Sequence, residues 1–117
     1  MDDQLKQLFD YTKFHIGMYT TLIAGIVGVF TNVYGKAQYT PMIGYIQWSV
    51  VAFVVAGMAG GLVASSIPHF SKFEDFKKAS LGPWSTKIFP SMLCIHVEHS
   101  AFWAGCFIAV YGLFETL

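Results

Sequence analysis

Three long apolar runs dominate this chain and leave few folds open to it. They cover approximately residues 14–34, 42–67 and 90–114. Each run reaches the roughly 20 residues that a helix needs to cross the hydrocarbon core of a bilayer. In that core every backbone N–H and C=O must find its partner inside the protein, which a helix provides within its own segment. The sequence therefore predicts an all-α integral membrane protein with three transmembrane helices.

The composition of the chain agrees with this class. Of its 117 residues, 55% are hydrophobic and 12% are charged, whereas a soluble domain carries roughly 25% charged residues. Residues 1–117 are thus expected to form a single membrane domain surrounded by lipid. The formal net charge is zero, so no strongly basic face is available to bind nucleic acid.

The segment 68–89 is the one sizeable polar connection between the apolar runs. Ser71 and Glu74 match the capping box that often starts a helix. Phenylalanines recur every three residues between lysines, which is typical of a helix lying on the membrane surface. The expected surface anchor consists of Phe70, Phe73, Phe76, Lys72, Lys77 and Lys78. The sequence predicts a short amphipathic helix here, on a segment that is also available to dock a soluble partner.

The lysines predict the orientation of the chain in the membrane. All seven basic residues are lysine, and Lys36 is the only one in the first connection. The other six belong to the N-terminal segment and to the segment 68–89. Basic residues are enriched on the cytoplasmic side. We therefore expect the N-terminus and the segment 68–89, with its amphipathic helix, to be cytoplasmic and the C-terminus to lie outside.

Small residues occur on all three apolar runs at the spacing of a helix face. Such residues let membrane helices approach closely. The positions expected to pack helices together are Gly17, Gly25, Gly28, Gly57, Gly60, Gly61, Gly105 and Ala109. Because three helices alone enclose too little volume for a transport path, we expect the bundle to self-associate as a homo-oligomer.

Ionisable residues gather near one end of the predicted bundle. Glu98, His96 and His99 lie near the start of the third run, and His15 lies near the start of the first. On a helical wheel Glu98 shares a face with the small residue Gly105, so it should point into the bundle or toward an oligomer axis. Ionisable side chains in a membrane helix are costly and usually functional.

Several interpretations of this cluster stay open. A ring of Glu98 side chains flanked by histidines would form a cation-attracting or pH-sensitive constriction. His96 and His99, three residues apart, are weak candidates for holding a metal or haem with His15 or Glu98. A histidine–carboxylate pair is also a catalytic arrangement, but no nucleophile motif or cofactor fingerprint accompanies it. Finally, Glu98 and the histidines would need no function if headgroups or Lys87 solvate them at the interface.

We expect a small homo-oligomeric channel or pore-forming protein rather than an enzyme. Its ion-path candidates are Glu98, His96, His99 and His15, which would form a collar at the cytoplasmic mouth. No cofactor is assigned. The alternative is a membrane-anchor or accessory subunit of a larger complex, holding a metal or haem through its histidines.

Overall fold

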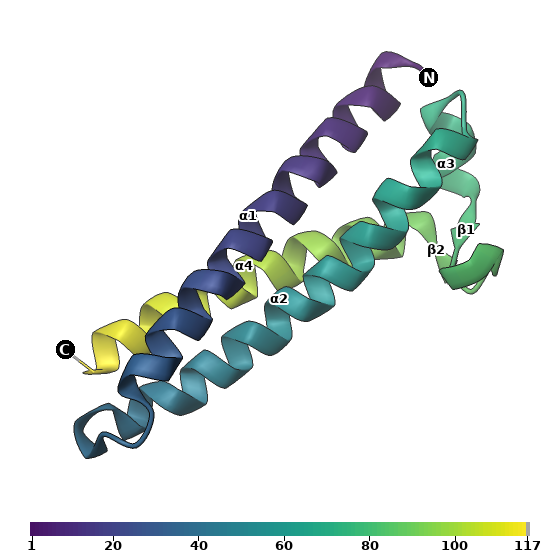
Figure 1. The fold of residues 1–117 in the computed structure, drawn as a ribbon. Coiled ribbons are helices and arrows are strands. Elements are labelled where there is room, and N and C mark those ends of the chain that lie inside the picture. The colour runs from purple at the N-terminus through teal and green to yellow at the C-terminus, as the bar shows by residue number, and fades with distance from the viewer. Residues whose placement is uncertain (117) are drawn as a thin grey trace.

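The computed structural model describes residues 1–116, apart from the side chain of Ser85, and is helical along most of the chain. Three long helices, α1 (Asp3–Val33), α2 (Thr40–Ser66) and α4 (Ser91–Thr116), make up an elongated bundle (Figure 1). Its principal extents are 53 × 25 × 18 Å. All three helices are long and apolar enough to cross a membrane. The prediction of an all-α chain with three such helices is confirmed, and it indicates a membrane protein.

The first helix is longer than the apolar run that predicted it. It begins at Asp3 because the Asp2 carboxylate accepts the backbone N–H of Leu5 at 2.9 Å. Its 31 residues extend for about 46 Å, more than the roughly 30 Å of a hydrocarbon core. The polar residues before residue 14 therefore continue the helix directly rather than forming a separate surface segment.

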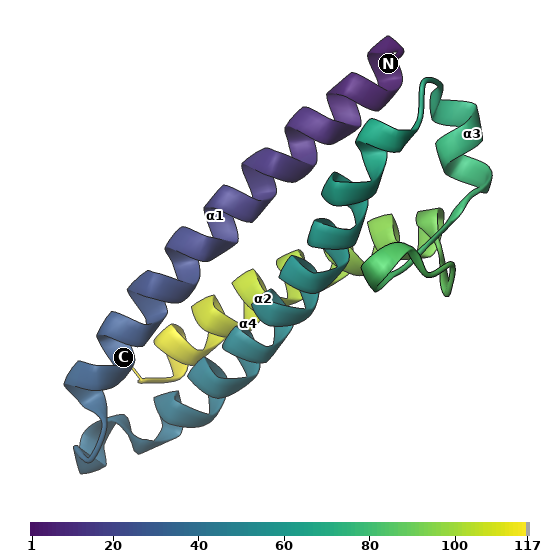
Figure 2. The ribbon, with the colours of Figure 1, turned by 45° about the vertical axis from the view of Figure 1, so that its right-hand side comes forward.

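The connections divide between the two ends of the bundle. A short 3₁₀ turn, Ala37–Tyr39, joins α1 to α2 at the end where the chain also finishes (Figure 2). At the other end, a 3₁₀ turn at Ile67–His69 leads into the short helix α3 (Phe73–Lys78). The N-terminus lies beside this second connection, as Figures 1 and 2 both show.

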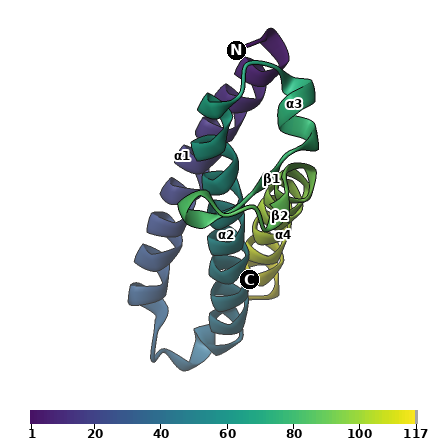
Figure 3. The ribbon, with the colours of Figure 1, turned by 90° about the vertical axis from the view of Figure 1, so that its right-hand side faces the viewer.

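Between α3 and α4 the chain forms a small hairpin. The two-residue strands β1 (Ser80–Leu81) and β2 (Phe89–Pro90) pair in antiparallel fashion around a 3₁₀ turn at Pro83–Ser85. The hairpin lies beside α2 and the start of α4 (Figure 3). Trp84 at its tip has a positive φ of 52° and is 95% exposed.

The start of α3 differs from the capping box predicted at Ser71. Lys72 precedes the helix and makes no side-chain cap. Instead, the Asp2 carboxylate accepts the Phe73 N–H at 2.8 Å, and the Asp2 N–H donates to the Ser71 carbonyl at 2.8 Å. One residue at the chain start therefore caps α1 and also holds α3, a pairing that no local pattern could reveal.

The phenylalanines of this segment also differ from the predicted surface anchor. Phe76 is fully buried among Leu5, Ile67 and Leu81, and Phe70 and Phe73 pack half-buried against the same cluster. An anchoring role in the acyl boundary is therefore wrong for Phe76. The side chains of Lys72, Lys77 and Lys78 are exposed.

The tightest helix pair is α2 with α4, where two glycines allow close contact. A Cβ on Gly105 would lie 2.8 Å from the Phe53 ring, and one on Gly112 would lie 2.5 Å from Cβ of Tyr45. The buried Ser49 hydroxyl also donates to the Gly105 carbonyl at 2.9 Å. Small residues with one interhelical hydrogen bond are the usual means by which membrane helices associate.

Candidate functional site

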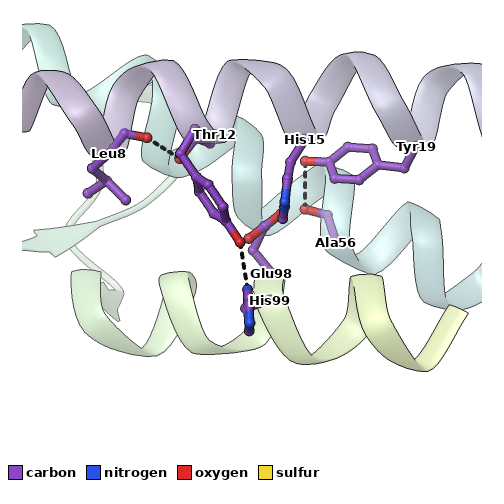
Figure 4. Close-up of polar contacts among 8 residues, drawn as sticks. Leu8, Thr12, His15, Tyr19, Ala56, Glu98 and His99 are labelled. Atoms are coloured by element: carbon purple, nitrogen blue, oxygen red, sulfur yellow. Dashed lines mark hydrogen bonds and ion pairs between the residues drawn. The ribbon is translucent and has the colours of Figure 1, made fainter. Parts of the chain in front are cut away.

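Two ionisable side chains meet in the space between α1 and α4. His15 Nδ1 lies 2.8 Å from Glu98 Oε1, and the two residues are 6% and 3% exposed. Figure 4 shows the side chains pointing toward each other from the two helices. The sequence placed Glu98 on the protein-facing side of its helix, and its partner is His15 rather than Lys87. An isolated charge in such surroundings is costly, whereas a hydrogen-bonded pair is tolerated.

Aromatic rings enclose the imidazole of His15. The Tyr11 ring lies 4.1 Å from it on one side and the Phe102 ring 4.6 Å from it, between ring centroids. His15 and Tyr11 are four residues apart on α1, so they are neighbours on one helix face. These rings restrict the orientation of the imidazole and keep lipid and water from the Glu98 contact.

A second polar bridge lies next to the first. The Tyr11 hydroxyl and His99 Nδ1 are 2.8 Å apart, and both residues are exposed. The rings of His15 and His99 are nearly parallel, with centroids 6.3 Å apart. The two bridges therefore join α1 to α4 at one level, one buried and one at the surface of the chain.

Helix α2 packs against the site and contributes no ionisable group to it. The Tyr19 hydroxyl donates to the Ala56 carbonyl at 3.4 Å, a contact drawn in Figure 4. A Cβ on Gly60 would collide with that hydroxyl and would lie 3.3 Å from Cγ of Glu98. Gly60 therefore makes room for both side chains, and a larger residue there would force the Tyr19 hydroxyl to move and would crowd Glu98.

The arrangement can hold or release a proton inside the bundle. Neutral imidazole carries one N–H proton. When the pair holds one proton more than this, it has no net charge. Removing this proton leaves a net negative charge, and adding another leaves a net positive one. The chemistry available is therefore proton binding coupled to the contact between α1 and α4.

The remaining histidines lie apart from this pair. His96 is exposed on α4, and His69 is exposed at the end of α2. Within residues 1–116, no group of three or more His, Cys, Asp or Glu side chains is placed to hold a metal ion. Of the four histidines, the structure brings His15 and His99 together around Glu98 and leaves His96 and His69 outside.

The glycines singled out from the sequence fall into two groups. Gly57, Gly60 and Gly105 contact side chains of neighbouring helices within the chain. A Cβ added to Gly17, Gly25, Gly28 or Gly61 would meet nothing within 4 Å. Ala109 lines a groove of about 380 Å³ between α1, α2 and α4, toward the end where the chain finishes.

Sequence reasoning missed both tyrosines of the site. Tyr11 lies four residues before His15 and Tyr19 four residues after it, so both follow the same face of α1. That spacing was the available signal, because aromatic residues bracketing a histidine on one face mark the side that packs against protein. Comparisons of this chain with protein-family models, curated proteins and solved structures find no match.

Proposed function

We propose that the protein is a pH-responsive channel that works as a homo-oligomer in the membrane. The observation that carries the proposal is the buried His15–Glu98 pair, 2.8 Å between Nδ1 and Oε1. Ionisable residues inside membrane helices are rare and mark ion paths, proton relays and switches.

The ion path of the proposal lies between copies of the chain. Three helices enclose too little space for a path of their own, so copies must pack around it. The glycines of α1 offer a face for this packing, since a Cβ added to Gly17 or Gly28 would meet no atom within 4 Å in the single chain and such residues favour close helix contact.

Acidification is the proposed trigger. A second proton on the pair gives imidazolium beside a neutral carboxyl group, which removes the ionic attraction between α1 and α4. The other titratable groups around the pair are Tyr11 and Tyr19 on α1 and His99 on α4. Weakening the pair lets α1 move away from α4 and opens the path beside Glu98.

The experiment is a flux measurement on the full chain in liposomes. We expect potassium efflux to be faster at pH 5 than at pH 7.5, and Glu98→Gln to remove this pH dependence. His96→Gln is the matched control, because this histidine is exposed and outside the pair. No flux above protein-free liposomes, or an unchanged pH response in Glu98→Gln, would overturn the proposal. A strict monomer by cross-linking in a bilayer would also contradict it.

The orientation belongs to the same proposal. The N-terminus and the segment 67–90 lie at one end of the bundle (Figure 1), and six of the seven lysines lie in or near these segments. We propose that this end is cytoplasmic. A cysteine placed at Lys36 should react with an impermeant reagent from outside only, and labelling from inside would reverse the orientation.

A second candidate function is that of an accessory subunit in a larger complex. It is favoured by the exposed charges of α3, Glu74 and Asp75 in its first turn and Lys77 and Lys78 in its last. The phenylalanines of this helix face inward and leave its charged surface free for a soluble partner. His96 and His99 would hold any metal or haem of such a complex. This candidate predicts a partner at fixed stoichiometry in native membranes that is lost in Lys77→Glu. An absorption spectrum and elemental analysis of that complex test the cofactor.

A further inference from the structure

The hairpin between α3 and α4 folds beside the end of α2 and leaves a hollow of about 410 Å³ between them. Its polar lining combines two basic side chains with several hydroxyls. These residues are Ser65 and Ser66 on α2, His69 in the 3₁₀ turn after it, and Ser80, Thr86 and Lys87 in the hairpin segment. Trp84, 95% exposed, lies on the same lining. The hollow is thus a basic and hydroxyl-rich site at one end of the bundle.

A second hollow of about 280 Å³ lies between α2 and α4 and is almost wholly apolar. Its lining includes Val55, Met58 and Leu62 on α2 with Leu93 and Val97 on α4. Leu62 also lines the polar hollow. The two hollows therefore adjoin, with Leu62 at their boundary.

The α2 residues of both hollows follow one face of the helix. The positions are 55, 58, 59, 62, 65 and 66, spaced by the three and four residues that return to the same side of a helix. His69 follows in the 3₁₀ turn after the helix. The apolar part lies along the span, and the polar part lies where α2 ends. A continuous surface of this kind, apolar within the membrane and basic at its edge, matches a molecule with an anionic head and a hydrocarbon tail.

We propose that these two hollows form a binding site for one anionic phospholipid. Its phosphate lies against Lys87 and His69, and one acyl chain lies in the apolar hollow. Charge complementarity supports an anion, since the described residues hold a single ion pair, His15–Glu98, which leaves Lys87 without a carboxylate partner there. Basic pockets beside membrane helices recognise anionic headgroups, and an exposed tryptophan such as Trp84 is typical of the headgroup level.

Lipid titration of the full-length protein, followed by native mass spectrometry from detergent, tests the headgroup part. We expect phosphatidylglycerol to bind more tightly than phosphatidylcholine of the same chains. Lys87→Gln should weaken phosphatidylglycerol binding by roughly fivefold, the effect of one lost charge near a membrane surface. Lys77→Gln is the control, because Lys77 is exposed on α3 and does not line the hollow. Equal binding of the two lipids, or equal effects of the two variants, would overturn the proposal.

The acyl part needs its own variant. Leu93→Trp fills the apolar hollow and should weaken binding of both lipids, whereas Val110→Trp, an exposed position of the same helix outside both hollows, should not. Inorganic phosphate, added at a similar concentration to the protein with bound phosphatidylglycerol, should fail to displace the lipid. Displacement would identify a site for free anions and contradict the phospholipid assignment, and so would unchanged binding in Leu93→Trp.

Discussion

His15 and Glu98 are 83 residues apart in sequence and 2.8 Å apart across the α1–α4 contact. Because both side chains are buried, each depends on the other as its hydrogen-bond partner. Glu98→Ala would leave a buried imidazole without its partner, and we expect it to lower the free energy of unfolding by about 1–3 kcal/mol. Glu98→Gln keeps an amide oxygen that accepts from the imidazole and should cost less.

Unfolding in mixed micelles, followed by circular dichroism, measures both variants. The matched cycle combines His15→Ala with Glu98→Ala, and we expect a coupling energy of about 1 kcal/mol or more, because each single change removes the same contact. Additive single effects would show that the pair contributes no mutual stabilisation.

The glycines of the α2–α4 contact should respond differently from Gly25, which lines the groove between α1, α2 and α4. Gly105→Ala places a methyl group 2.8 Å from the Phe53 ring, and overpacking of this kind costs about 1–3 kcal/mol. Gly25→Ala meets no atom within 4 Å and should gain up to about 1 kcal/mol of helix propensity in the monomer. Unfolding of both variants in detergent compares them, and equal destabilisation would contradict the described packing.

The Ser49 hydroxyl should make a small but measurable contribution. It is fully buried and donates to the Gly105 carbonyl at 2.9 Å. Interhelical hydrogen bonds in membranes average about 0.6 kcal/mol, so Ser49→Ala should destabilise by about that amount. The exposed Ser100 supplies the control, since Ser100→Ala removes a hydroxyl that faces away from the contact. A larger loss for Ser100→Ala would reverse the assignment.

Acid should loosen the contact that Asp2 makes between α1 and α3. The backbone N–H of Phe73 and, to a smaller degree, that of Leu5 lower the pKa of the Asp2 carboxyl below its usual 3.8. A lowered carboxyl pKa means that the stabilisation is complete above the unfolded pKa and is lost as the pH falls through the folded one. Amide exchange of Phe73 should therefore accelerate below about pH 4 beyond the intrinsic pH effect, and Asp2→Asn should abolish that acceleration. Unchanged exchange in the variant would show that the carboxylate is not the cap.

The chain's helices could be predicted from sequence more fully than their contacts. Runs of about 20 apolar residues require helices in a bilayer, and that part is confirmed. A helical wheel also gives the direction of Glu98 relative to its own helix. It does not say which neighbour lies opposite, so sequence reasoning names Lys87 as the partner of Glu98 and misses Tyr11. The cap of α3 was missed for a similar reason. Ser71 matches a capping box locally, whereas the residue that caps the helix, Asp2, lies far from Phe73 along the chain.

The error at Phe76 has a different origin. A three-residue repeat of phenylalanines fits a helix on the membrane surface and a helix packed against protein equally well. The fold distinguishes these two cases, because Leu5 at the start of α1 and Leu81 in the hairpin cover Phe76. The self-association expected from the open glycines of α1 stays a prediction, with cross-linking as its measurement.

The 83 residues between His15 and Glu98 also set an order of events during synthesis. Translation at about 5–20 residues per second separates the two residues by roughly 4 to 17 seconds. Through that interval the imidazole of His15 has no carboxylate to meet. The carboxylate arrives later, on α4, and finds its imidazole partner already in place. Glu98 therefore becomes buried beside its partner only when the bundle assembles. In a chain lacking His15, we expect α4 to stay inserted in the membrane less well.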